Sequence, residues 1–583
     1  MIGASARGKN LQIHLSGREL HYAEEKINAL DCTNDVNRAR REISDRCRQE
    51  AEQQPGIYQL CVPTGSGKTL SALRFALAHA AKWGKRRLIF TSPLLSILEQ
   101  NASVIRDYIS DQSLILEHHS NAVEPEDIGD ELNPAELYQD NWEASIIITT
   151  MVQFLDTCFG EKMSNIRRFH SLCDAVIVID EIQSLPSNLL TMFSLMMTFL
   201  SRVCGATIIF CTATQPNWEK LDHPLMQMPR DIVPYEENLW SAFKRTTILD
   251  GGTCTLEEMP ARIEKLIEGT DSLLVICNKK NESEYLYEQC RDKYECYHLS
   301  ASMCIAHRKK VLDHLRGALR KHGGKQILCI ATQVIEAGVD ISFSRVVRLL
   351  AGLDNVVQAA GRCNRNGEYH KVCKVYTLCL TNEKLEKLEE IRMAKAAAWE
   401  TLRSYAGNPK RYRSDLTSRE AIADYYEIYY REMSDGYQDD AVAGQSYTVY
   451  SLMSDNMALA ARSRSGGQPH LLNQSFRLAG EYFKVFDDDT IQAVVPYEGG
   501  REIIAGLESE QAGYDPEFQK SLMKQARAYT VTLYPYQLAE LRKEKAVIEV
   551  DRGGLHSWYL LDGYYDADTG VTMTPKPSAF LGV

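Results

Sequence analysis

The stretch Pro63-Thr64-Gly65-Ser66-Gly67-Lys68-Thr69 decides the fold. It follows an apolar run, 58–62, that predicts a buried strand, and it precedes an amphipathic stretch, 70–82, that predicts a helix. A glycine-rich loop between a strand and a helix turns its backbone N–H groups toward phosphate oxygens. We therefore expect residues 64–69 to bind ATP, with Lys68 on the β- and γ-phosphates and the Thr69 hydroxyl on Mg²⁺.

A regular alternation surrounds this loop. Between residues 58 and 380, short apolar runs alternate with longer stretches of helical period. Consecutive Val, Ile and Leu residues are typical of parallel strands that are buried on both faces, and the intervening helices indicate βαβ crossovers. The expected strands lie at 58–62, 88–91, 145–150, 176–179, 206–212, 272–278, 327–332, 346–350 and 374–380. The pattern predicts an α/β fold with two doubly wound parallel sheets.

The pattern also suggests domain boundaries. The stretch 226–243 lacks a strand signal and contains Pro229 and Pro234, so we place a linker at 233–245. After residue 380, a charged stretch predicts a helix at 381–405, a polar stretch at 441–474 predicts a loop, and strand-like runs follow at 529–534, 546–550 and 557–561. The predicted parts are a helical N-terminal extension at 1–50 (helical from about Asn34), a first lobe at 51–232, a second lobe at 246–380, and a linker helix with a smaller α+β accessory domain at 381–583.

Composition narrows the function classes. The chain has 583 residues, 44% of them apolar and 25% charged, which is typical of an ordinary folded protein and excludes disordered and collagenous chains. No signal-peptide run or membrane-length apolar run is visible, so a cytoplasmic location without membrane contact is expected. The net charge of −12 argues against a basic coat for duplex DNA, although not against a local groove. The sixteen cysteines contain no C-x-x-C pair, which favours reduced thiols over zinc sites.

A second acidic motif complements the phosphate loop. The run 176–179 ends at Asp180-Glu181-Ile182-Gln183, which places two carboxylates at the end of a buried strand. We expect Asp180 to hold Mg²⁺ through water and Glu181 to polarise the attacking water. Adjacent carboxylates alone also fit an ordinary strand end, so this assignment depends on Lys68.

Phosphoryl transfer also needs positive charge opposite the loop. The stretch from Gln358 to Arg365 places Arg362 and Arg365 one helical turn apart. We expect both to share one helix face and to reach the γ-phosphate across a cleft between the lobes.

These stretches resemble, in order, the motifs of a superfamily two helicase. Such a helicase has two tandem RecA-like lobes with nucleic acid across their upper face. The resemblance covers motifs I (63–69), Ia (91–100), II (180–183), III (211–216), V (331–340) and VI (358–365). It implies that Gln183 and the loop 212–214 couple the two sites, and that Gly338 and Asp340 meet the nucleotide.

The resemblance is more specific to the CRISPR-associated helicase of type I interference systems, the Cas-three family. The similar segments are 116–121, 149–154, 298–303, 335–340, 358–368 and 564–571. This resemblance implies an ATP-driven 3′-to-5′ translocase on single-stranded DNA that a crRNA-guided, Cascade-like surveillance complex recruits. It implies DNA-backbone contacts by Pro93, Ser96, Gln100, Thr149, Thr150, Gln153, Thr332 and Gln333.

One departure from this family concerns its HD nuclease. That domain binds metal through His and Asp, including an adjacent His-Asp pair, and no His-Asp dipeptide occurs in this sequence. About fifty residues before the first lobe are too few for that domain. We therefore expect the helicase part alone, without nuclease activity, and a nuclease on another polypeptide or lost. For Glu117, His118 and His119, a structural or DNA-proximal role is favoured over metal binding.

Two alternatives stay open. The six motifs do not discriminate sugar type, so an RNA helicase outside CRISPR is compatible with them. A non-motor, ATP-switched binding module is the other alternative, and the presence of Glu181, Arg362 and Arg365 argues against it.

Overall fold

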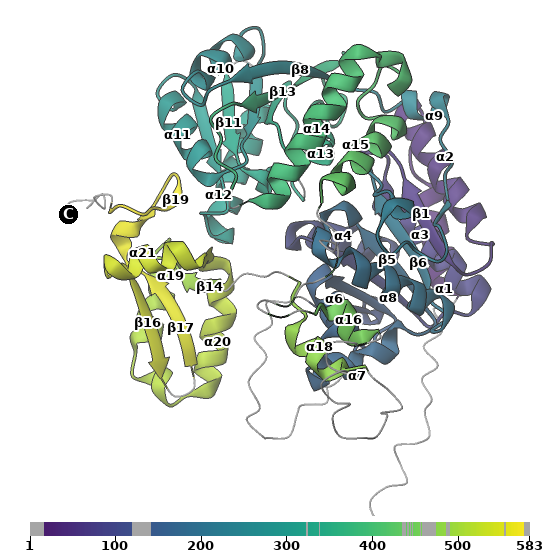
Figure 1. Cartoon of the computed structure of the whole chain (residues 1–583). Helices are drawn as coiled ribbons and strands as arrows, with labels where there is room; N and C mark the ends of the chain where they lie inside the picture. The colour runs from purple at the N-terminus through teal and green to yellow at the C-terminus, as the bar shows by residue number, and fades with distance from the viewer. Residues whose placement is uncertain are drawn as a thin grey trace, which may run out of the picture. The chain divides into compact units, whose positions relative to one another are not determined.

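The computed structural model describes residues 17–118, 141–321, 325–336, 338–386, 388–433, 447–454, 474–485, 490–552 and 555–575, and the single positions 439, 442, 445 and 456. Within these ranges the chain forms two compact units (Figure 1). The first unit contains the described residues up to Lys244 and those of 419–485. The second contains Arg245–Ser418 and the described residues from 490 onward.

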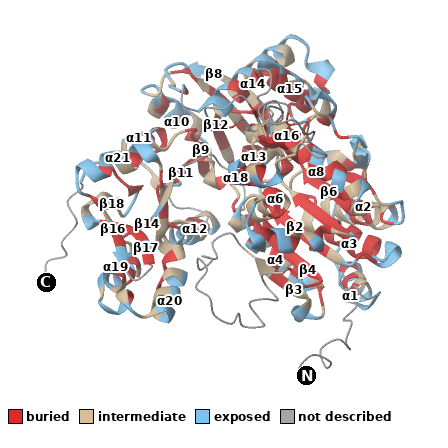
Figure 2. Ribbon diagram, turned by 60° about the horizontal axis from the view of Figure 1, so that its bottom comes forward, coloured by how far each residue is buried: buried red, intermediate tan, exposed pale blue. Residues whose placement is uncertain are grey.

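The first unit is built on a parallel sheet whose described strands number seven. Their order is β3 (Ile115–His118), β4 (Ile146–Thr150), β2 (Arg87–Ser92), β5 (Ala175–Asp180), β6 (Thr207–Thr212), β1 (Ile57–Cys61) and β7 (Arg230–Asp231). The crossover helices include α3 (Lys68–Trp83), α4 (Leu95–Tyr108), α6 (Met151–Phe159), α7 (Met163–Arg168) and α8 (Leu190–Arg202). Central strands are almost fully buried, as in Figure 2, because helices cover both faces. The predicted doubly wound α/β lobe is confirmed.

The stretch 226–243 differs from the expectation that it lacks a strand. Its strand β7 pairs in parallel with β1, and Gln59 Nε2 donates to Asp231 Oδ1 at 2.8 Å. A strand of two residues is too short to produce an apolar run, which explains why the pattern missed it. A short helix, α9 (Glu237–Ser241), follows it.

Two helices precede the sheet. Asn34 caps α2 (Asp35–Glu50) by accepting a hydrogen bond from the N–H of Asn37 at 2.8 Å, close to the expected helix start. Another helix, α1 (Gly17–Asn28), comes before it and was not predicted. Both helices are bound to α3 through Arg74, which is 5% exposed.

The segment 419–485 also belongs to the first unit, although the sequence grouped it with the accessory domain. Its described helices are α15 (Arg419–Glu432), α16 (Val449–Met453) and α18 (Phe476–Tyr482). Arg419 pairs with Asp231 at 3.0 Å, and the hydroxyls of Tyr429 and Ser187 lie 3.0 Å apart. Helix α16 lies inside the expected loop 441–474, most of which is outside the described residues.

The second unit contains another parallel sheet, with six described strands. Their order is β10 (Glu295–Leu299), β11 (Ile327–Ala331), β9 (Ser272–Ile276), β12 (Arg345–Leu349), β13 (Cys373–Leu380) and β8 (Thr246–Cys254). Its helices are α10 (Met259–Ile267), α11 (Lys280–Cys290), α12 (Ile305–Arg320) and α13 (Leu353–Ala360). The helix expected at 381–405 is α14 (Glu389–Gly407), which begins later than predicted.

The C-terminal part of this unit is a smaller α+β domain, as predicted. Its mixed sheet has the order β15 (Thr530–Leu533), β14 (Ile491–Val494), β17 (Leu555–Leu560) and β16 (Val547–Arg552), with helices α19 (Gly500–Glu508), α20 (Pro516–Ala526) and α21 (Pro535–Lys543). A hairpin of β18 (Tyr565–Asp566) and β19 (Gly570–Val571) joins it to the parallel-sheet lobe. There the N–H of Val571 donates to the carbonyl of Ser302 at 2.9 Å.

Two further features concern the cysteines and the apolar character of the helices. All sixteen cysteines are free thiols, and nine are buried. Of the helices that the structure describes, none combines the length and apolar character needed to cross a bilayer.

Candidate active site

The phosphate loop lies between β1 and α3, as the sequence predicts. Gly65 and Gly67 both have φ of +81°, a conformation that favours glycine. The N–H of Ser66 donates to the carbonyl of Pro63 at 3.2 Å, and the Ser66 hydroxyl is buried without a hydrogen bond inside the described structure. An orphaned buried hydroxyl at a helix N-terminus fits a site for phosphate oxygens.

Lys68 lies at the first position of α3 and points to the end of β5. Its Nζ lies 3.0 Å from Glu181 Oε1. Burial has the largest single effect and lowers the pKa of Lys68, but the attraction of Glu181 and Asp180 and the hydrogen bond to Glu181 together outweigh it, so the pKa is raised above its ordinary value. Lys68 is therefore a fixed positive charge between the two motifs.

Asp180 is the last residue of β5, and both of its carboxylate oxygens accept hydrogen bonds. Oδ1 accepts from the backbone N–H of Glu181 at 3.1 Å, and Oδ2 accepts from Asn101 Nδ2 at 3.0 Å. Burial, and then the nearby charge of Glu181, raise the pKa of Asp180 against the opposing effect of Lys68. Glu181 has φ of +49°, a strained conformation that turns its side chain toward Lys68.

A chain of hydrogen bonds runs from Glu181 to the end of β6. Gln183 Nε2 donates to Glu181 Oε2, and the Thr212 hydroxyl donates to Gln183 Oε1 at 2.5 Å. The Thr212 oxygen in turn accepts from the N–H of Thr214 at 2.9 Å. The structure thus joins the acidic motif to the loop 212–214 by direct contacts.

Sequence reasoning missed two contributors to this site. Asn101, in α4, accepts from the Thr69 hydroxyl at 2.9 Å and also donates to Asp180. Arg40, in α2, donates through Nε to the carbonyl of Gly65 at 2.8 Å. Neither belongs to a recognisable motif, because a single Asn or Arg inside a helix carries no spacing signal.

The donor set fits a nucleotide with Mg²⁺. The Thr69 hydroxyl and the Asp180 carboxylate are hard oxygen ligands, the type that Mg²⁺ prefers, and one amide side chain bonds both. Elsewhere in the described part of the chain, no group of three His, Cys, Asp or Glu side chains is arranged to hold a metal. His118 packs 5.9 Å from the Trp142 ring, and His119 lies outside the described residues.

The arrangement of Arg362 and Arg365 corrects one expectation. They do not share a helix face, because α13 ends at Ala360 and Asn364 has φ of +47°. Arg362 is 6% exposed and donates to the carbonyls of Ile335 at 2.9 Å and Glu336 at 2.6 Å.

Arg365 differs from Arg362 in exposure and partner. Its Nε lies 2.9 Å from Oδ1 of Asp340, whose side chain is 63% exposed. Gly338, in the same turn, has φ of +71°. The turn is also held by Glu336, which pairs with the fully buried Arg348.

The residues expected to contact DNA divide between the units. In the first unit, two groups of these residues lie at the ends of the neighbouring strands β2 and β4. The end of β2 is followed by Pro93, Ser96 and Gln100, and β4 ends with Thr149 and Thr150, which Gln153 follows. Gln100 is exposed, whereas Thr149 is fully buried, Thr150 caps α6, and Gln153 accepts from Arg168 at 2.9 Å. Thr332 and Gln333 follow β11 in the second unit.

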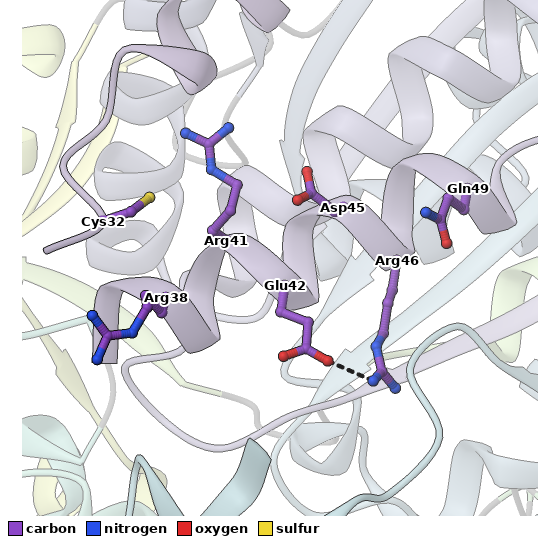
Figure 3. Close-up of a pocket in the computed structure, with 7 residues that line it drawn as sticks. All are labelled: Cys32, Arg38, Arg41, Glu42, Asp45, Arg46 and Gln49. Atoms are coloured by element: carbon purple, nitrogen blue, oxygen red, sulfur yellow. Dashed lines mark hydrogen bonds and ion pairs between the residues drawn. The ribbon is translucent and has the colours of Figure 1, made fainter. Parts of the chain in front are cut away.

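A separate pocket along α2 is lined by none of the phosphate-loop residues (Figure 3). Its arginines are already paired within the chain: Arg46 lies 2.6 Å from Glu42, Arg38 pairs with Asp35, and Arg41 donates to Asn28.

The fold and the site resemble the ATP-binding core of helicases with two RecA-like lobes. Residues 42–221 match the DEAD/DEAH box helicase family, and residues 269–368 match the C-terminal family of the CRISPR-associated nuclease/helicase Cas3. Both matches agree with the resemblance noted in the sequence motifs.

Curated relatives and solved structures show the same similarity. The Cas3 nuclease/helicase of Haloferax volcanii is 24% identical over 472 residues, covering 62% of this chain and 50% of the relative. That of Methanothermobacter thermautotrophicus is 25% identical over 343 residues, covering 54% and 39%. The chain spans half or less of the length of these relatives. A T. fusca Cas3–ATP crystal structure shares the fold, with a TM-score of 0.58, 13% identity, and coverage of 94% of this chain and 72% of that one.

Proposed function

We propose that this chain is a cytoplasmic ATP-dependent translocase that moves 3′-to-5′ along single-stranded DNA in type I CRISPR interference. The observation that carries the proposal is the constellation of Lys68, Asp180 and Glu181 at the ends of neighbouring elements in one lobe. Relatives named Cas3 nuclease/helicase, and a T. fusca Cas3 structure with ATP, support it.

Lys68 would exchange its Glu181 partner for the β- and γ-phosphates of ATP. Thr69 and Asp180 would hold Mg²⁺, which supplies positive charge to the phosphate oxygens when bound. Glu181, released from Lys68 and steadied by Gln183, would accept a proton from the attacking water. Arg365, whose side chain is 22% exposed and pairs with the exposed Asp340, suits the role of an arginine that reaches the γ-phosphate better than the buried Arg362 does.

The DNA role rests on the predicted backbone contacts of α4 and of the ends of β4 and β11. A contact to sugar and phosphate alone lets a motor ignore sequence. A fold match at TM-score 0.53 to a chain of a CRISPR RNA-guided surveillance complex supports recruitment by a Cascade-like complex. We further propose that this chain does not cut DNA and that a separate HD nuclease acts with it.

A direct test measures ATP hydrolysis by the purified chain with Mg²⁺ alone, with single-stranded DNA and with RNA of the same sequence. We expect stimulation at least tenfold greater by DNA than by RNA, displacement of a strand from a 3′-tailed duplex, and no cleavage. A preference for RNA would favour the RNA-helicase alternative. Nucleotide binding without strand displacement would favour the switch alternative, and metal-dependent cleavage would refute the proposed absence of nuclease activity.

A further inference from the structure

We propose that Asn101 is a positioning residue that fixes the two Mg²⁺ ligands of the ATP site to each other and to helix α4. The proposal rests on the proposed function, since it concerns the same site. It extends that function by assigning the link between the hydrolysis site and the helix that carries Gln100.

Asn101 is 6% exposed and bonds a different ligand with each end of its amide. Oδ1 accepts from the Thr69 hydroxyl at 2.9 Å, and Nδ2 donates to Asp180 Oδ2 at 3.0 Å. Bridging a hydroxyl donor and a carboxylate acceptor requires a side chain that accepts and donates at once. A carboxylate here would repel Asp180, and an aliphatic side chain would leave both groups without this partner.

The two bonds orient the ligands for a cation. The Thr69 hydrogen is directed to Asn101, which leaves the lone pairs of that oxygen free to bind a metal. Asp180 is held at Oδ2 by Asn101 and at Oδ1 by the Glu181 N–H, so its carboxylate cannot rotate without breaking a bond. Groups that orient metal ligands in this way typically change metal affinity 10–100-fold when they are removed.

Asn101 also connects this site to α4. Helix α4 begins two residues after Pro93, and the exposed Gln100 is the neighbour of Asn101 in the sequence. Adjacent residues of one α-helix move together, so movement of a DNA strand bound by Gln100 would displace Asn101 as well. The grip on DNA and the geometry of the Mg²⁺ ligands are thereby coupled through one side chain.

The test compares Asn101→Leu, which keeps the number and branching of the side-chain heavy atoms and removes both hydrogen bonds, with the wild-type chain. Thr198→Val is the matched control, because it removes a buried hydrogen bond to Ser194 in α8 of the same unit. Binding of a fluorescent ADP analogue is titrated with and without Mg²⁺, and ATP hydrolysis is measured with and without single-stranded DNA. Thermal unfolding is followed in parallel.

We expect Asn101→Leu to bind ADP without metal with an affinity within twofold of wild type. The increase in ADP affinity that Mg²⁺ produces should be at least tenfold smaller than in wild type. Its DNA stimulation of hydrolysis should fall by a similar factor, and Thr198→Val should change neither quantity. Asn101→Ser, whose side chain is too short to bridge both ligands, should show the same losses if the leucine prevents folding.

Contrary outcomes separate the two proposals. Unchanged Mg²⁺ dependence and DNA stimulation in both Asn101 variants, with only a lower unfolding temperature, would overturn the role of Asn101 while the proposed function stands. A wild-type chain that shows no Mg²⁺-dependent nucleotide binding would instead refute the proposed function.

Discussion

Lys68 and Glu181 form an ion pair inside the first unit, with Nζ 3.0 Å from Oε1 and both side chains largely shielded from water. The same ammonium is the group expected to bind the phosphates of ATP. We therefore expect nucleotide and carboxylate to compete for one cation, so that binding of the first releases the second. The released carboxylate is the expected general base, so nucleotide binding would itself prepare the site for hydrolysis.

Glu181→Gln tests this competition. We expect nucleotide affinity to stay equal or to rise, since Lys68 loses a charged partner, while kcat falls at least about 100-fold because the general base is lost. Fluorescent-nucleotide binding and single-turnover hydrolysis measure the two effects. Lys68→Ala is the companion variant, and it should lose nucleotide binding itself. Intact turnover in Glu181→Gln would contradict the assignment.

The two arginines of the last motif should differ in their effects. Arg362→Ala removes a buried guanidinium that holds two carbonyls, so we expect a loss of about 2–3 kcal/mol in the free energy of unfolding. Arg365→Ala should leave stability within about 0.5 kcal/mol, since its partner Asp340 is exposed, but lower kcat at least 10³-fold. Chemical denaturation and ATP hydrolysis of both variants make the comparison. Equal loss of stability in the two variants would refute this division of roles.

The sequence predicted what depends on local pattern. Apolar runs located the central strands, because strands buried on both faces need uninterrupted Val, Ile and Leu. The phosphate loop and Asp180-Glu181 were found because their chemistry requires fixed spacing. Their contact in space followed from the parallel sheet, whose strands end at one edge.

Other features depend on packing that a sequence pattern does not encode. Strand β7 has two residues and pairs only at the sheet edge. The segment 419–485 contacts the first unit through isolated pairs such as Arg419–Asp231. Asn101 acts through two hydrogen bonds that join distant parts of the chain, so no local motif marks it. The helix face assumed for Arg362 and Arg365 failed because α13 ends before either residue.

Arg74→Ala should weaken the attachment of the N-terminal helices. Its side chain is 6% exposed and lies 2.7 Å from Glu24 in α1 and 2.6 Å from Asp45 in α2, so its removal breaks the ion pairs that join both helices to α3. We expect a loss of about 2 kcal/mol in the free energy of unfolding, together with faster proteolysis within residues 17–50. Arg38→Ala is the control, because its 58% exposed side chain pairs only at the surface and should cost less than about 1 kcal/mol.

His79 should make the first unit less stable in mild acid. Burial lowers its pKa from 6.5 to about 4, partly opposed by the bond to the Ala51 carbonyl. The unfolded chain therefore binds more protons than the folded chain between these values, so this contribution to stability is complete above pH 6.5 and is lost as the pH falls toward 4. From pH 7 to pH 5, we expect this group to cost about 2 kcal/mol.

Denaturation of His79→Gln at both pH values checks this expectation. The glutamine can still bond Ala51 and Thr207 but takes up no proton, so the loss between pH 7 and pH 5 should shrink by about 2 kcal/mol. His21→Gln, at a 76% exposed position, should leave the pH dependence unchanged. An equal pH dependence in wild type and His79→Gln would contradict the role assigned to burial.

Gly570→Ala should loosen the accessory domain from the parallel-sheet lobe of the second unit. Gly570 has φ of +86°, and a Cβ placed there would lie 2.3 Å from the carbonyl oxygen of Ser302. That same oxygen accepts the hydrogen bond from Val571, so the substitution strains the backbone and breaks the contact together. We expect a cost of at least about 2 kcal/mol, measured by denaturation, and new protease cleavage near residue 490. Gly513→Ala is the matched control, since no heavy atom lies within 4 Å of its added Cβ and its stability should stay within about 0.5 kcal/mol of wild type. If both alanines behave alike, the hairpin of β18 and β19 does not hold the accessory domain in place.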